Sequence, residues 1–235
     1  MQRIKALGGK LDSSQWSALA RIAREFTPGT PLHLATRQDL ELHNMRQDIV
    51  PAVQRRLAEA GLTGRGACGD TVRNITVCPC SGLLPGTVNL FPLALRMQGM
   101  LEATDGIFAL PRKFKISLSC GPDCGQPRLN DLGLVAKCRD AQWGFEVTAG
   151  GSHGPRPLAG MLVFDWLQAA EVLPLLTAAI EVSAELGDRQ NRARARLRHV
   201  RERLGDAAFA RLIREQTEAA ACLLYTSDAA DEEDS

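Results

Sequence analysis

The sequence is poor in aromatic residues, has almost no net charge and contains no long apolar run. Aromatic side chains make up 5% of its 235 residues, and the formal net charge is +1. A surface that binds nucleic acid needs stacking rings and a basic field, so both shortages speak against such a partner. No stretch reaches the roughly 18 consecutive apolar residues of a membrane-spanning helix. The start, MQRIKALGGK, lacks the apolar segment of a secretory signal, so we expect a cytoplasmic chain.

Strand and helix signals are present in two blocks. In residues 1–62 the predicted elements are a strand at 2–5, an amphipathic helix that starts near residue 13, a strand at 32–36 and a second amphipathic helix at 49–60. In residues 63–220 they are a Gly/Cys-rich loop at 63–86, a helix at 89–104, strands at 113–119, 132–138 and 143–151, an ambiguous segment at 160–168, and helices at 169–187 and 192–220 with a break at Gly205. This order predicts an α+β fold built of α/β sandwich layers.

The last residues differ from the rest of the chain. CLLYTSDAADEEDS, at 222–235, changes abruptly from a basic amphipathic pattern to an acidic one. A solvated acidic terminus is one interpretation. The string also reads like a translated sequencing adapter, and we therefore expect 222–235 to be a non-native tail.

A pair of lysines stands in the best strand signal. Lys113 and Lys115 are two residues apart, so on a strand they share one side while Phe114 faces the other. Two like charges side by side are unfavourable unless an anion lies between them. A solvated strand edge guarded by lysine is the alternative interpretation.

Several motifs occur in the order known from one family: TRQ at 36–38, GDTVRN at 69–74, LPRKFK at 110–115, NDLGLVA at 130–136 and GDRQNRARARLRHV at 187–200. With these motifs the chain resembles the siroheme-dependent nitrite and sulfite reductases over residues 1 to about 215. The resemblance implies a ferredoxin-like half-domain at 1–62 followed by a siroheme/iron-sulfur reductase-type α+β domain at 63–220. It also implies that the chain is the first, N-terminal half of a pseudo-twofold protein, a fragment inactive by itself.

The resemblance implies roles for individual residues. Those that would neutralise the oxygens of sulfite or nitrite are Arg37, Arg73, Lys113 and Lys115. Those that would reach siroheme are Gln38, Asn74, Gly150, Gly151 and Arg192. Turn hydrogen bonding accounts equally well for the two amides, and plain solvation accounts for a single arginine.

The cysteines match the family's cluster motif only in part. That motif is Cys-x5-Cys followed by Cys-x3-Cys, and Cys78, Cys120 and Cys124 fit it, but the fourth position is Val72. A [4Fe-4S] cluster needs four thiolates. The set is a vestigial cluster site, a site completed irregularly by Cys68 or Cys80, or a group of plain small buried residues.

The resulting hypothesis is the N-terminal half of an oxidoreductase that uses siroheme and a [4Fe-4S] cluster for the six-electron reduction of sulfite or nitrite. The cluster ligands would come mainly from a second half, and electrons from a ferredoxin or a reductase subunit. No nucleic acid or membrane is expected as a partner. Two alternatives remain open: a precorrin monooxygenase of the cobalamin pathway, which shares the fold, and a non-catalytic binding module.

Overall fold

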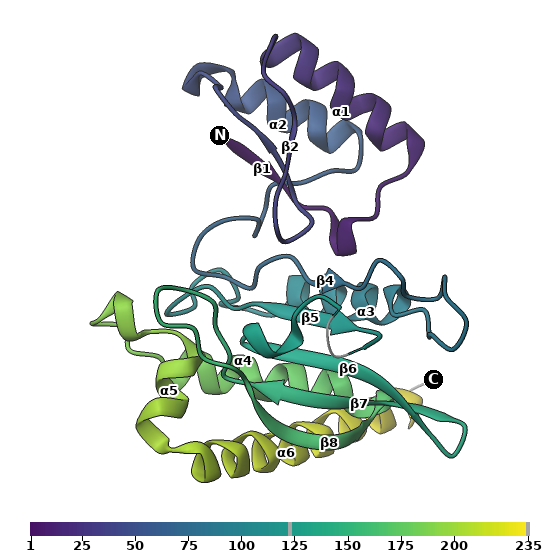
Figure 1. Ribbon diagram of the computed structural model, residues 1–235, viewed down its shortest axis with the longest axis vertical. Helices are drawn as coiled ribbons and strands as arrows, with labels where there is room; N and C mark the ends of the chain where they lie inside the picture. Colours follow the sequence, from purple (N-terminus) through teal and green to yellow (C-terminus); the bar gives the residue numbers. More distant parts are fainter. Residues whose placement is uncertain (122–123, 234–235) are drawn as a thin grey trace.

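The computed structural model describes the backbone of residues 1–121 and 124–233, and the side chains of these ranges as far as residue 223. Two units follow one another along the chain, and Figure 1 shows the smaller one above the larger one. Helices and sheets are present in both units, which confirms the predicted α+β class. No helix in the described part of the chain combines the length and the apolar character needed to cross a membrane.

The smaller unit is a three-stranded antiparallel sheet with two helices against it. Its elements are β1 (Gln2–Ile4), η1 (Leu7–Gly9), α1 (Ser13–Phe26), β2 (His33–Leu34), β3 (Leu40–Leu42), η2 (Gln47–Ile49) and α2 (Val50–Glu59), with strand order β1-β3-β2. The Asp12 side chain accepts a hydrogen bond from the Gln15 amide at 2.8 Å, and this capping box starts α1 as expected. Alternation in β3 turns Leu40 and Leu42 into the core against the helices. The sequence patterns had predicted only two strands here.

The larger unit is a five-stranded mixed sheet in the order β4-β5-β6-β7-β8. Its elements are β4 (Thr76–Val77), α3 (Phe91–Ala103), β5 (Ile116–Ser119), η3 (Pro127–Leu129), β6 (Leu132–Arg139), β7 (Gln142–Ala149), β8 (Met161–Gln168), η4 (Ala169–Glu171), α4 (Val172–Leu186), η5 (Arg192–Arg194), α5 (Leu197–Leu204) and α6 (Asp206–Glu233). The first three strands are mutually parallel and the last three antiparallel. Helix α4 packs against α6, which runs beside the edge strand β8 (Figure 1).

The observed elements can be compared with four segments singled out in the sequence. The ambiguous segment at 160–168 is strand β8, paired with β7. The helix predicted from 192 is wrong in its first turns, because η5 is a single 3-10 turn and Arg196 is extended before α5 begins. The break at Gly205 is confirmed. Helix α6 continues to Glu233 and so includes most of the predicted tail, while 234–235 lie outside the described residues.

The two units are joined by backbone contacts around η1. The Gly8 amide donates to the Ile75 carbonyl at 3.1 Å. Gly8 has φ +58, and a Cβ there would lie 2.9 Å from Val77 Cγ2, so only glycine allows this approach. The Gln38 side chain donates to the Val77 carbonyl and accepts from its amide, at 2.8 and 2.9 Å. These bonds place the turn after β2 directly on the edge strand β4.

Candidate functional site

A cavity of about 360 Å³ opens at the seam between the two units. Its lining comes from the turn after β2, from β4, from the segment before β5 and from the loop around η3: Thr36, Arg37, Gln38, Thr76, Val77, Pro79, Lys115, Gly125, Gln126, Leu129, Asn130 and His153. A second cavity of about 490 Å³ shares His153 and contains Arg156, Arg194, Arg196, Arg198 and His199 in its wall. The two cavities share this one lining residue, and together we call them the basic hollow.

Arg37 is clamped in the first cavity by three acceptors from the larger unit. Its Nη1 donates to Asn130 Oδ1, and its Nη2 donates to the carbonyls of Asn74 and Ile116, all at 2.7 Å. Its Nε is buried without a hydrogen-bond partner among the described residues. Burial lowers the pKa of the guanidinium to about 10, so Arg37 stays charged at neutral pH.

Lys113 and Lys115 lie in the extended segment that leads into β5. Phe114 between them is 1% exposed, so the two lysines share the opposite side, as their spacing predicts. Neither ammonium makes a hydrogen bond or ion pair with any described residue. Burial, then Arg196, Arg37 and Lys113, lower the pKa of Lys115 to about 8. Burial, followed by Arg112 and Arg73, also lowers the pKa of Lys113.

Arg73 stands beside this cavity and is tied to its own loop. Its guanidinium donates to the Gly69 carbonyl at 3.1 and 2.9 Å and to the Ala67 carbonyl at 3.1 Å. Its positive field nevertheless lowers the pKa values of Arg37 and Lys113. The structure thus brings Arg37 and Lys115 into one cavity, with Lys113 and Arg73 electrostatically coupled to them.

Sequence reasoning did not select two charged residues of this site. Arg196 is 11% exposed and forms an ion pair at 2.6 Å with Asp131, whose carboxylate is fully buried. The charge of Arg196 is, after burial, the largest influence on the pKa of Lys115. One sequence signal could have found both residues. Asp131, in NDLGLVA, stands directly before a buried strand, and a buried carboxylate needs a partner cation.

The remaining predicted siroheme contacts are engaged inside the chain. Asn74 donates to the carbonyls of Ala6 and Arg37 at 2.6 and 2.9 Å, and Gln38 is paired with β4. A Cβ on Gly151 would lie 2.2 Å from the Arg128 carbonyl oxygen. The neighbouring Gly150 has φ +70. Both amides are thus engaged in hydrogen bonds within the chain, and contact of these four residues with siroheme stays a prediction.

Arg192 lies apart from the two cavities. Its guanidinium forms a bidentate ion pair with Asp70, which also accepts from Arg112 at 2.9 Å. The side chain of Arg192 is 65% exposed. The chain becomes extended at Arg196, whose side chain turns inward and is 11% exposed.

The cysteines form a pair in this structure. Cys78 follows β4 and is joined to Cys124 by a disulfide, while Cys120 lies at 3.8 Å from the Val88 carbonyl. Among the described residues, no group of three or more His, Cys, Asp or Glu side chains could hold a metal ion. The disulfide offers no thiolate, so these cysteines do not fit a cluster here, and their role as ligands stays a prediction for the reduced chain.

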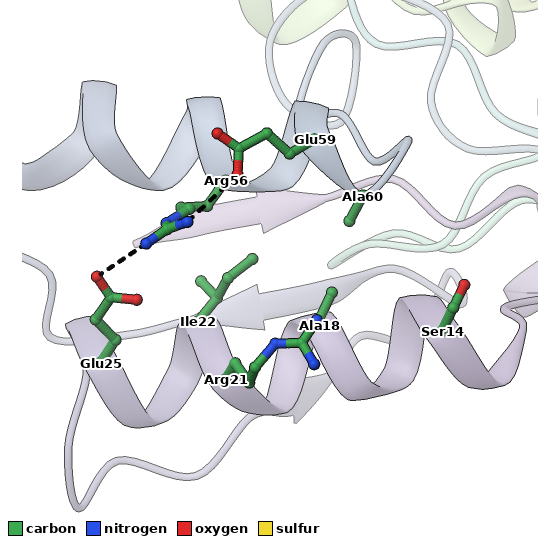
Figure 2. Close-up of a pocket in the computed structure, with 8 residues that line it drawn as sticks. All are labelled: Ser14, Ala18, Arg21, Ile22, Glu25, Arg56, Glu59 and Ala60. Carbon is green, nitrogen blue, oxygen red and sulfur yellow. Dashed lines mark hydrogen bonds and ion pairs between the residues drawn. The ribbon is translucent and has the colours of Figure 1, made fainter.

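A further groove lies between α1 and α2, away from the predicted residues. Figure 2 shows Arg56 reaching across it toward Glu25, and Arg56 also pairs with Glu59, at 3.8 and 3.4 Å. These are exposed i,i+3 and interhelical pairs, which contribute little free energy. The groove is occupied by its own ion pairs and offers no match to the motifs.

Two family descriptions match the chain. "Nitrite and sulphite reductase 4Fe-4S domain" matches residues 68–220, and "Nitrite/Sulfite reductase ferredoxin-like half domain" matches residues 1–60. The chain is 34% identical to the assimilatory ferredoxin-dependent nitrite reductase of Haloferax mediterranei, covering 84% of this chain and 37% of that protein. It is 28% identical to the sulfite reductase [NADPH] hemoprotein beta-component of Shewanella baltica, covering 85% and 41%.

A solved structure gives the same result. The NirA protein of Mycobacterium tuberculosis superposes with a TM-score of 0.84 at 26% identity, covering 92% of this chain and 40% of that one. The chain therefore spans about two fifths of the length of these relatives. The match over residues 68–220 covers more than half of the sequence and includes most of the residues that line the two cavities. The chain belongs to the nitrite and sulfite reductase family.

Proposed function

We propose that the chain is the N-terminal half of a siroheme and [4Fe-4S] oxidoreductase that reduces sulfite or nitrite by six electrons. Its own part would be the cationic surface that holds the anion. The observation that carries this proposal is the pair of ammonium groups of Lys113 and Lys115, which have no partner among the described residues, next to the clamped Arg37. Partly buried cations without partners are costly, and an anionic ligand removes that cost.

The basic hollow fits a group that carries carboxylates. Arg37 leaves a buried Nε without a partner, and Lys115 leaves its whole ammonium free within the described part of the chain. The neighbouring cavity adds Arg194, Arg196 and Arg198. The arginines of this neighbouring cavity would hold carboxylates of siroheme, which when bound would supply the electron-transfer chemistry at its iron.

The side chains themselves would bind and orient the substrate and deliver a proton. Three of the five N–H donors of Arg37 are held by acceptors of the larger unit, and the remaining donors, Nε–H among them, would bind the oxygens of a small oxyanion. Lys115, with a pKa of about 8, is protonated at neutral pH and close enough to its titration point to give up a proton at Nζ. Lys113 and Arg73 add positive charge from the side.

No step is assigned to a cluster on this chain, because its described cysteines do not present four thiolates. We propose that the cluster ligands lie mainly outside these residues, in the part of the relatives that the chain does not cover. The electron donor would be a ferredoxin or a reductase subunit, since relatives are named as ferredoxin-dependent and as an NADPH hemoprotein component.

The test is expression of the gene extended beyond the codon for Ala221, with siroheme supplied. A siroheme absorption spectrum and methyl-viologen-driven turnover would support the proposal, and the faster of sulfite and nitrite names the substrate. Lys115→Met should abolish most turnover, whereas Lys137→Met, which removes a lysine paired with Glu146 on the β6–β7 hairpin, should leave it intact. An extended protein that binds no siroheme would refute the proposal.

A further inference from the structure

Asp131 lies between η3 and β6, next to a group of cations that we call the cation cluster: Arg37, Lys113, Lys115 and Arg196. Its carboxylate is 0% exposed and uses both oxygens. Oδ2 accepts from the Lys115 backbone amide at 2.9 Å and from Arg196 Nη2 at 2.6 Å, and Oδ1 accepts from Arg196 Nε at 3.3 Å. One side chain thus connects the segment before β5 to the residue that precedes α5.

The charges that face Lys115 come from four places in the fold. Arg37 follows β2, Lys113 precedes β5, Arg196 precedes α5, and all three lower the pKa of Lys115. Asp131 is the only carboxylate among these influences and raises it. His153 lines the same cavity. The field of Asp131 also reaches Arg37 and Lys113, so one buried negative charge offsets several positive ones and leaves a net positive hollow.

We propose that Asp131 is the positioning residue of the anion site: it turns Arg196 into the hollow, fixes the backbone of Lys115 and places a negative charge beside these two cations. This inference rests on the anion-binding function proposed above. Asp131 contacts neither substrate nor cofactor in this role and acts only through the two cations.

The carboxylate is required in its ionised form. An arginine presenting Nε and Nη2 matches the two oxygens of a carboxylate, whereas an amide offers only one acceptor. Burial raises the pKa of Asp131, and the Arg196 guanidinium and the Lys115 amide oppose that rise. A buried ion pair often adds no stability over a well-packed apolar pair, so fold stability alone does not account for this one.

The Lys115 pKa is the readout, measured on the full 235-residue chain without cofactor. The lysines of the chain are Lys5, Lys10, Lys113, Lys115 and Lys137, few enough to resolve by reductive ¹³C-methylation and ¹H–¹³C spectra across a pH series. In D131N the Lys115 pKa should fall by about one unit, because the carboxylate that raises it is lost. In R196Q it should rise, because the largest like charge is lost. Loosening of the fold would instead raise the pKa toward 10.5 in both variants.

Sulfite and nitrite titrations of the same signals separate this inference from the proposed function. In D131N at pH 8, the change that sulfite causes in the Lys115 signal should be about fivefold smaller. The reason is that the protonated fraction of Lys115 falls about fivefold when its pKa drops by one unit. The matched control is D165N, which removes an exposed Asp–Arg pair at 3.1 Å on β8 and should change neither value. A Lys115 signal in the unaltered chain that ignores both anions refutes the proposed function. An unchanged or raised Lys115 pKa in D131N, with sulfite binding retained, refutes the role of Asp131 alone.

Discussion

Replacing Lys115 by methionine should make the isolated chain more stable at pH 7. In the folded chain burial, together with Arg196, Arg37 and Lys113, lowers the pKa of this lysine from its ordinary 10.5 to about 8. Since one pKa unit corresponds to about 1.4 kcal/mol, the protonated side chain costs at most ~3 kcal/mol relative to the unfolded state. Lys115 is half-buried, so solvent screening reduces this to about 1 kcal/mol. Methionine keeps the apolar stem and removes the charge.

The pH dependence of this effect has a definite sign. Between pH 8 and 10.5 the unfolded chain holds the Lys115 proton and the folded chain does not, so the stability of the unaltered chain rises with pH in that window. The Lys115→Met chain lacks this rise. Its advantage should therefore be full below pH 8 and disappear as the pH approaches 10.5.

Urea unfolding of both chains at several pH values between 7 and 10 measures the difference. Lys137→Met is the control, because Lys137 is paired with Glu146 and stands apart from the cation cluster. A constant difference across this range, or a Lys115→Met chain less stable at pH 7, would refute the reasoning that Lys115 is held protonated against a repulsive field.

Three further predictions concern other parts of the site. Arg37→Lys should destabilise the chain by about 2–4 kcal/mol, since an ammonium cannot hold all three acceptors of the fork and leaves buried carbonyls unpaired; urea unfolding checks it. Breaking the Cys78–Cys124 disulfide, which spans 46 residues, should cost about 4 kcal/mol by loop entropy, and unfolding with and without reductant measures it, provided that thiol counting first finds the pair oxidised. Gly151→Ala should lower the thermal midpoint by several degrees, because its Cβ would meet the Arg128 carbonyl at 2.2 Å, and a melt that matches the unaltered chain would contradict this.

Sequence patterns were sufficient for the fold class and for the lysine pair. The alternation around Phe114 placed Lys113 and Lys115 on one side, and the structure confirms that side because Phe114 is buried. Periodicity reports which face of an element is apolar, and that is a local property. Periodicity therefore succeeded for elements that bury their own apolar face in the core, such as α1, which buries Leu19 and Ile22.

The sequence could not identify residues that depend on convergence between distant segments. Asp131 and Arg196 are 65 residues apart and meet only in the folded chain. Arg192 was assigned to siroheme by the family resemblance, whereas a 3-10 turn and an extended residue decide which arginine points inward. The Cys spacing likewise matched the family's cluster motif only in part, and the pairing of Cys78 with Cys124 follows from the approach of two loops.

The anion site and the seam between the two units share Arg37, so substitutions at Arg37 and at Lys115 test different properties of the site. Its guanidinium carries charge into the cavity and also bonds the turn after β2 to Asn74, Ile116 and Asn130 of the larger unit. A change at Arg37 therefore alters docking of the smaller unit and anion binding together. Lys115 makes no side-chain hydrogen bond to any described residue, so a change there removes charge while the seam stays bonded. A loss of anion affinity on substituting Lys115 thus reports on electrostatics alone. Any larger loss of anion affinity on substituting Arg37 measures how far the site depends on the seam.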